Sequence, residues 1–172
     1  MTPIRLFLFS LLISSVALCN LQAQSYQQAI GLRLGVPVSA SYKFFLEGTN
    51  NAIEGFVSYD QAKFQGSGWS WISIGGGYQI HNDLSSVTDG LQWYYGAGAA
   101  MFLWTFDSDF SVVADQASLS VGLLGFIGLD YKIPNAPVNV SADWVPTLFL
   151  NGFDSGFGAG YGAIAVRYIL KE

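Results

Sequence analysis

A long stretch of alternating apolar and polar residues, from Ser118 to Leu150, constrains the fold of this chain more than any other feature. In both of its arms, most large apolar side chains share one parity, while small and polar side chains hold the other. Successive side chains of a β-strand point to opposite faces, so a period of two predicts strands. Pro134, Asn135 and Pro137 supply the turn between the arms. The stretch therefore predicts a long hairpin with one apolar face and one polar, glycine-rich face.

The first 23 residues have the pattern of a cleaved export signal. Arg5 provides a positive start, an apolar run from Leu6 to Leu18 follows, and the small residue Ala23 precedes the expected cleavage point. The run is too short to span a bilayer as a permanent helix. We therefore expect residues 1–23 to be a signal peptide and residues 24–172 to be a β-barrel.

Removal of the signal changes the charge and the thiol content. Cys19 is the only cysteine, so the mature chain is expected to have no thiol and no disulfide. Without Arg5, six Lys and Arg face twelve Asp and Glu, a net charge of −6 (6 − 12). Such a chain lacks a basic patch that would meet phosphates, so nucleic-acid binding is not expected.

The same alternation recurs along the mature chain and predicts eight strands. Strands this long, behind an export signal, favour a sheet that closes in a membrane. The expected fold is all-β, an eight-stranded antiparallel up-and-down transmembrane β-barrel. Pro146 cannot donate to a ladder, so a bulge or strand end is expected there. The predicted strands are 29–36, 38–46, 52–59, 69–80, 91–104, 118–133, 138–150 and 160–170.

The charged residues of the strands all fall on the face opposite the apolar one. A basic residue facing lipid at the midplane costs about 2–4 kcal/mol, so lipid would enforce this separation. Aromatic residues near strand ends are typical of interfacial girdles. Three cations and three carboxylates in a narrow interior are expected to pair, because an unpaired buried charge is costly. This structural lumen network comprises Arg33, Lys43, Glu54, Asp130, Asp143 and Arg167.

Six segments of the predicted strands and turns carry a resemblance to a known family. They are AIGLRLG (29–35), SYKFFL (41–46), NAIEGFV (51–57), GLQWYYGAGA (90–99), GLDYKIPNAPVNVSADWVP (128–146) and GAIAVRYIL (162–170). On these segments the chain resembles the small eight-stranded outer-membrane β-barrel proteins of Gram-negative bacteria, with a layout similar to OmpA and the OmpX-like proteins. The resemblance covers essentially the whole mature chain. One departure is the end of the chain, where Leu170 is followed by Lys171 and Glu172 instead of a terminal aromatic residue.

The resemblance implies a location and a topology. The chain would lie in the cell outer membrane after export, with both mature ends in the periplasm. Its partners would be outer-membrane lipids and lipopolysaccharide, and it would be a monomer. Turns 47–51, 81–90 and 132–137 would be periplasmic, while the segments around Pro37, 60–68, 105–117 and 151–158 would face outside.

The sequence contains little that indicates chemistry. His81, the only histidine, falls in the predicted turn 81–90 near Asp83, and we interpret it as a surface residue. Asp107, Asp109 and Asp115 mark an acidic loop without the spacing of a known calcium site. No catalytic residue, cofactor or metal site is predicted.

The expected function is that of an integral outer-membrane barrel with a side-chain-filled lumen and a structural or surface-interaction role. One alternative is a soluble, exported lipocalin-like barrel, in which the apolar face would point inward around an apolar ligand. A narrow pore and a lipid-modifying barrel enzyme are the remaining alternatives.

Overall fold

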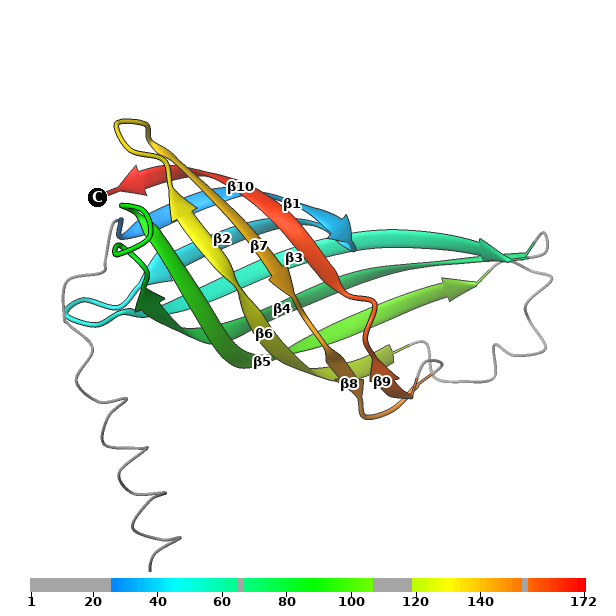
Figure 1. Ribbon diagram of the computed structural model, residues 1–172. Helices are drawn as coiled ribbons and strands as arrows, with labels where there is room; N and C mark the ends of the chain where they lie inside the picture. The colour runs from blue at the N-terminus through cyan, green and yellow to red at the C-terminus, as the bar shows by residue number, and fades with distance from the viewer. Residues whose placement is uncertain (1–25, 65–66, 107–118, 153–154) are drawn as a thin grey trace, which may run out of the picture.

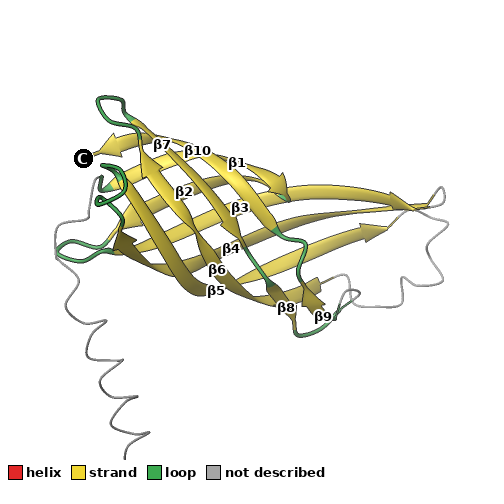
Figure 2. Cartoon of the chain, viewed as in Figure 1, coloured by secondary structure: helices red, strands yellow, loops and turns green. Residues whose placement is uncertain are grey.

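The computed structural model describes residues 26–64, 67–106, 119–152 and 155–172, and their regular structure consists of β-strands alone (Figure 2). No helix among these residues is long and apolar enough to cross a bilayer. Residues 1–23, the predicted signal peptide, lie outside the described residues. The strands are β1 (Gln28–Val36), β2 (Val38–Phe45), β3 (Asn51–Phe64), β4 (Ser67–Asp83), β5 (Leu91–Phe106), β6 (Leu119–Lys132), β7 (Val138–Trp144), β8 (Thr147–Phe149), β9 (Gly156–Gly158) and β10 (Gly162–Lys171).

The strands form a closed antiparallel barrel of eight positions (Figure 1). Each strand from β1 to β6 pairs with the next along the chain, β6 pairs with β7 and β8, and β7 pairs with β10. The barrel closes where β1 pairs with β10, for example Leu32 with Val166. The ten labelled strands make eight strands of the barrel. β7 and β8 are two parts of the seventh strand, and β9 and β10 are two parts of the eighth. The predicted all-β, eight-stranded antiparallel barrel is confirmed.

Pro146 separates β7 from β8 without changing their register against β6. Trp144 pairs with Ile127 and Leu148 pairs with Leu123, so equal numbers of residues lie between the two pairs on both strands. The Gly125 N–H still donates to the Pro146 carbonyl at 2.9 Å. The strand is interrupted because proline lacks the N–H that would complete the ladder. Of the two outcomes expected at Pro146, the structure has the strand end.

The register instead shifts on the neighbouring wall, between β9 and β10. Trp144 pairs with Gly162, whereas Thr147 pairs with Gly158. Three residue steps from Trp144 to Thr147 therefore lie opposite four residue steps from Gly162 back to Gly158. The extra residue lies between the two strands, in the segment 159–161. There the Val145 N–H donates to the Tyr161 carbonyl. This irregularity was not predicted.

The two faces of the wall carry opposite kinds of side chain. Leu32, Leu34, Ile74 and Val166 are about half exposed on the outside, with relative exposures of 57, 57, 62 and 49%. Along β1 to β3, the residues between the outward apolar ones include serines and charged residues that are buried inside. The alternative of an apolar interior with a charged exterior is therefore wrong.

The strands differ greatly in length, so one side of the barrel wall is taller (Figure 1). β3 and β4 stay paired from Asn51↔Ile80 to Phe64↔Ser67. The polar loop predicted at 60–68 is therefore mostly strand, because the hairpin ladder continues through residues whose sequence has turn character. By contrast, β1 and β2 meet across the single residue Pro37, as the sequence predicts for a short connection.

The described interior contains two hydrophobic clusters. One lies toward the end of the barrel where β3 and β5 end and β4 and β6 begin, which we call the loop end. It includes Trp71, Phe102, Trp104 and Phe149. The opposite end, which we call the terminal end, carries the C-terminus and the turns 46–50, 84–90 and 133–137 (Figure 1). The cluster there consists of Tyr26, Ala29, Phe45, Ala52 and Ile169.

The outward aromatic residues are distributed unevenly. Tyr59 and Trp144 are exposed near the loop end. Phe157 on β9 is also exposed at that end. Most of the others gather near the turns of the terminal end, where Tyr42 lies against Phe44 and the rings of Trp93 and Tyr95 stack at 5.4 Å. Only one dense belt is present among the described residues, whereas the sequence pattern predicts a belt at each end. The belt of the terminal end consists of Tyr42, Phe44, Tyr78, Trp93, Tyr95, Tyr131 and Tyr168.

Candidate functional site

All six predicted network residues lie inside the barrel, on six different strands. Arg33, Lys43, Glu54, Asp130 and Arg167 are 0–4% exposed, and the Asp143 side chain is 1% exposed. In chain order, their strands are β1, β2, β3, β6, β7 and β10. The parity of each of these strands thus sends one network charge into the lumen.

Glu54 lies at the centre of the network. Its Oε1 accepts a hydrogen bond from Arg33 Nη1 at 3.1 Å and another from Arg167 Nη2. Its Oε2 accepts from Gln79 Nε2 at 2.9 Å and lies 3.7 Å from Lys43 Nζ. Lys43 and Glu54 are direct ladder partners on β2 and β3, so their pairing follows from the strand register. The single Glu54 carboxylate therefore lies within ion-pair distance of three cations.

The other two carboxylates bind the opposite sides of these cations. Asp143 Oδ1 accepts from Arg33 Nη2 at 2.8 Å, and its Oδ2 accepts from the Tyr94 hydroxyl at 2.6 Å. Asp130 Oδ2 accepts from Lys43 Nζ at 3.1 Å. Charge-assisted hydrogen bonds of this kind offset the loss of hydration that burial imposes. The six charges sum to zero.

Neutral side chains satisfy the remaining donors and acceptors. Arg167 donates through Nε to Ser41 Oγ at 3.1 Å and through Nη1 to Ser141 Oγ at 2.7 Å. Asn139 links the Arg167 guanidinium to Asp130. The Tyr26 hydroxyl also donates to Asp130, at 3.2 Å to Oδ2. The network is therefore continuous from the terminal end of the lumen to Arg33.

The backbones of β1 and β10 approach each other closely beside Arg167. Gly31 on β1 is the ladder partner of Arg167 on β10. A Cβ at Gly31 would lie 2.0 Å from the Val166 carbonyl oxygen and 2.5 Å from Arg167 Cα. Only glycine fits so close to another backbone.

Residues outside the predicted set complete the site. Tyr26, Gln79, Tyr94 and Asn139 all bind one of the three carboxylates, and Lys43 Nζ also lies 4.5 Å from the centre of the Tyr94 ring. The parity of the strands could have identified the last three, because each lies on the inward face. Tyr26 precedes the first predicted strand, so no alternation marks it.

The interpretation of His81 as a surface residue on a turn is wrong. β4 continues to Asp83, the turn occupies 84–90, and His81 is 2% exposed. Its ring stacks on Tyr94 at 4.7 Å and 17° and meets Phe45 edge-on at 4.7 Å. Its Nδ1 lies 3.1 Å from Gln92 Oε1. The ladder of β4 with β5 continues past Ile80 and carries His81, which has inward parity, into the lumen.

No group of three or more potential metal ligands lies close together in the part of the chain that the structure describes. Asp107, Asp109 and Asp115, the residues of the predicted acidic loop, lie outside that part. The described arrangement is a set of paired charges whose ion pairs and hydrogen bonds join six strands across the lumen.

Comparison with known proteins supports the fold. No protein-family model and no curated protein matches the chain. Among solved structures, the chain is similar to the crystal structure of Neisserial surface protein A (NspA), with a TM-score of 0.58. The match covers 83% of this chain and 93% of that chain at 13% sequence identity. The two chains share the fold.

Proposed function

We propose that this chain is an integral outer-membrane β-barrel with a lumen closed to ions and a structural or surface-interaction role without catalysis. The observation that carries the proposal is the outer face of the barrel. It is apolar over the middle of the described strands, where Leu32, Val57, Ile74 and Val166 are 49–62% exposed. An apolar band around a soluble barrel would have no partner, whereas acyl chains match it.

The placement of charge supports insertion into lipid. The six network charges point inward, and the other cations of the described strands, Lys63, Lys132 and Lys171, lie at strand ends. This pattern avoids the cost of about 2–4 kcal/mol for a basic side chain at the bilayer midplane. The aromatic belt of the terminal end would lie at one lipid–water interface.

The predicted signal peptide at residues 1–23 and the resemblance to outer-membrane barrels support the location. The fold shared with a surface protein, NspA, agrees with it. On this proposal the terminal end faces the periplasm and the loop end faces outside. The partners are outer-membrane lipids and lipopolysaccharide, not nucleic acid, and the barrel is a monomer.

The network supports a closed lumen. An eight-stranded barrel has an interior that side chains can fill. Here Glu54, Asp130 and Asp143 hold three cations across that interior, and the terminal-end cluster lies beneath them. Passage of an ion would require several buried pairs to separate, at a cost of several kcal/mol for each.

Spin labels test the orientation on which the proposal depends. The expected mature segment 24–172 contains no cysteine, so Leu123→Cys, Val140→Cys and Glu47→Cys can each be labelled alone. In lipid vesicles, labels at 123 and 140 should be relaxed by oxygen dissolved in the lipid and protected from water-soluble nickel complexes. The label at 47, on an exposed turn, should show the reverse. Water access at 123 and 140 would overturn the proposal.

A further inference from the structure

The wall of the barrel has a notch at the loop end. β1 and β2 stop at Pro37, where Val38 pairs with Tyr59 and Val36 pairs with Gly162. β3 continues beyond this level to Phe64, paired only with β4. On the other side, β9 pairs with β8 (Figure 1). The wall between β3 and β9 is therefore low, and Pro37 forms its rim.

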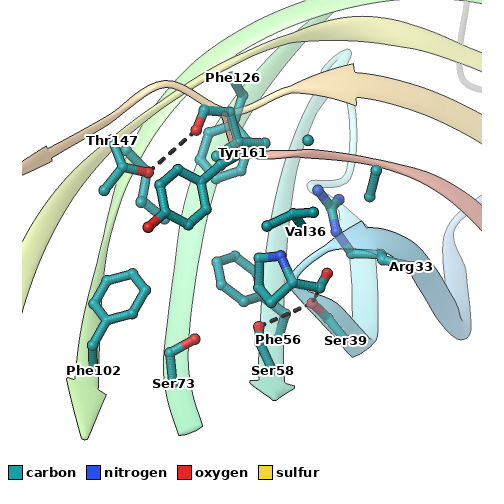
Figure 3. Close-up of a pocket in the computed structure, with 15 residues that line it drawn as sticks. Arg33, Val36, Ser39, Phe56, Ser58, Ser73, Phe102, Phe126, Thr147 and Tyr161 are labelled. Atoms are coloured by element: carbon teal, nitrogen blue, oxygen red, sulfur yellow. Dashed lines mark hydrogen bonds between the residues drawn. The ribbon is translucent and has the colours of Figure 1, made fainter. Parts of the chain in front are cut away.

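A cavity of about 40 Å³ lies just inside this rim (Figure 3). That volume holds about three water molecules or a similar number of non-hydrogen atoms. Its walls are mainly apolar, with Phe56, Phe102, Leu124 and Phe126 among them, and Arg33 lies at one side. Because Arg33 is engaged with two carboxylates, its charge is already neutralised. The cavity is therefore suited to an uncharged occupant.

One wall of the cavity is polar. Ser39, Ser58 and Ser73 are ladder neighbours on β2, β3 and β4, and all three face inward. Ser39 Oγ donates to Ser58 Oγ at 2.9 Å. Ser73 is 2% exposed, and its hydroxyl has no hydrogen-bond partner among the described residues. A buried hydroxyl without a partner is destabilising, and a ligand with a hydrogen-bonding group would recover the lost interaction.

Part of the lining of the cavity is exposed beside the apolar outer surface of the barrel. Its deep lining residues, such as Ser73 and Phe102, are buried. The exposed part of the lining is at the rim, where Val36 is 48% exposed and continues the outward apolar row of Leu32 and Leu34. Tyr59 and Trp144, the outward aromatic residues at this height, mark the level of the lipid interface. A molecule dissolved in the outer leaflet would thus reach the rim along an apolar surface.

We propose that this cavity is a lateral binding site for a slender, uncharged amphiphile of the linear-alcohol type. The hydroxyl and the first carbons occupy the cavity, where the hydroxyl bonds to Ser73. The remaining chain passes over Val36 and Pro37 and lies against the apolar outer surface. The proposal rests on the membrane insertion proposed above and adds a ligand class and an entry route.

The test uses Ser73→Cys in the mature chain, refolded into lipid vesicles. An apolar reagent, butyl methanethiosulfonate, should modify this cysteine, as read by intact mass. The anionic sulfonatoethyl reagent should react at least about tenfold more slowly. Ser120→Cys is the matched control, since Ser120 is buried on the inward face, bonds to Trp104 and does not line the cavity. It should resist both reagents.

Ligand binding is read as protection of the same cysteine. 1-Octanol at about ten times its dissociation constant should slow the modification about tenfold. An eight-carbon lysophospholipid has the same chain length but a headgroup too large for the cavity, so it should give no protection. Protection by the lysophospholipid and not by octanol would overturn the placement of the hydroxyl end.

Three further outcomes would overturn the proposal: no modification of Ser73→Cys, equal modification rates with both reagents, or no protection by octanol. The last outcome would mean that only water occupies the cavity. Each of these outcomes is interpreted only for protein that is inserted and folded. Such protein floats with the vesicles and migrates differently on gels with and without heating. Protein that fails to float contradicts membrane insertion instead, so the two proposals fail in different ways.

Discussion

At the scale of single residues, Glu54 links more charged groups than any other described side chain, contacting Arg33, Lys43 and Arg167. Glu54→Gln would leave three buried cations facing two carboxylates. Removing one partner of a buried pair typically costs about 3–5 kcal/mol, because the other charge remains buried. We expect the free energy of unfolding to fall by that order, as measured by urea titration in lipid vesicles.

Glu47→Gln is the control for this change. Glu47 lies on an exposed turn and accepts one exposed hydrogen bond from Gln27. Its substitution should alter stability by no more than about 0.5 kcal/mol, as is usual for surface positions. Equal effects at 47 and 54 would show that the network contributes no more to stability than a surface carboxylate.

Gly77 tests how tightly the interior is packed. A Cβ there would lie 2.3 Å from Cε2 of the Phe126 ring, whereas a Cβ at the outward Gly55 would meet no atom closer than 4.0 Å. Gly77→Ala should therefore destabilise the barrel by about 1–3 kcal/mol, the usual effect of overpacking. Gly55→Ala should have a much smaller effect in the same urea titration.

A smaller side chain in place of Phe126 provides a second check on the contact between Gly77 and Phe126. In the double variant Gly77→Ala with Phe126→Leu, the added methyl no longer meets the ring. The two changes should then be less destabilising together than the sum of their separate effects. Additive effects would contradict the contact between Gly77 and Phe126.

At the scale of elements, the pairing of β1 with β10 closes the barrel, and its register can be measured directly. Leu32 lies opposite Val166, and Leu34 lies opposite Ile164. Directly opposite residues on antiparallel strands have Cβ atoms about 4.5–5.5 Å apart, and diagonal ones about 7–8 Å. Leu32→Cys with Val166→Cys should therefore cross-link under mild oxidation, detected by gel mobility after unfolding.

The matched control shifts one cysteine along the same strand. Leu32→Cys with Ile164→Cys places the thiols diagonally, beyond the usual reach of a disulfide. It should cross-link much less. Preferential cross-linking of the diagonal pair would show that the register differs by two residues.

At the scale of the whole molecule, the network and the terminal-end cluster act as one closed section of the lumen. In planar bilayers the unmodified protein should give no stable current steps. The triple variant Lys43→Ala, Glu54→Ala and Arg167→Ala removes mutually paired side chains from the centre of the lumen. It should give measurable current steps if the barrel still folds, because a hydrated path replaces the paired charges.

Heat-dependent gel migration checks that the triple variant still folds as a barrel. A stable current through the unmodified protein would contradict a closed lumen. The absence of current in a folded triple variant would show that the terminal-end cluster closes the lumen alone.

Much of the wall was predictable from local pattern. A period of two assigns each residue to a face, and the requirement that large apolar residues share one environment selects which face is which. Leu32 and Leu34 on the outside, with Arg33 between them on the inside, illustrate this. The six network residues could be named for the same reason, since charge on an otherwise apolar strand marks the inward face.

Strand ends were harder to predict, because they depend on the partner strand. The segment 60–64 and the residues around His81 have polar or turn-like sequences, yet both remain in ladders with β4 or β5. Backbone pairing to an existing neighbour overrides weak local propensity. The misassignment of His81 follows directly from this.

Alternation along each strand, which is a local property, by itself determined the all-β class, the eight-stranded wall and the inward placement of the six charges. Only the tertiary structure decided which charges meet, how Tyr26, Tyr94 and His81 join them, and where the low wall at Pro37 exposes a cavity with Ser73 at its back. The physical reason is that these contacts depend on the register between strands distant in sequence, and on the curvature that brings opposite walls together.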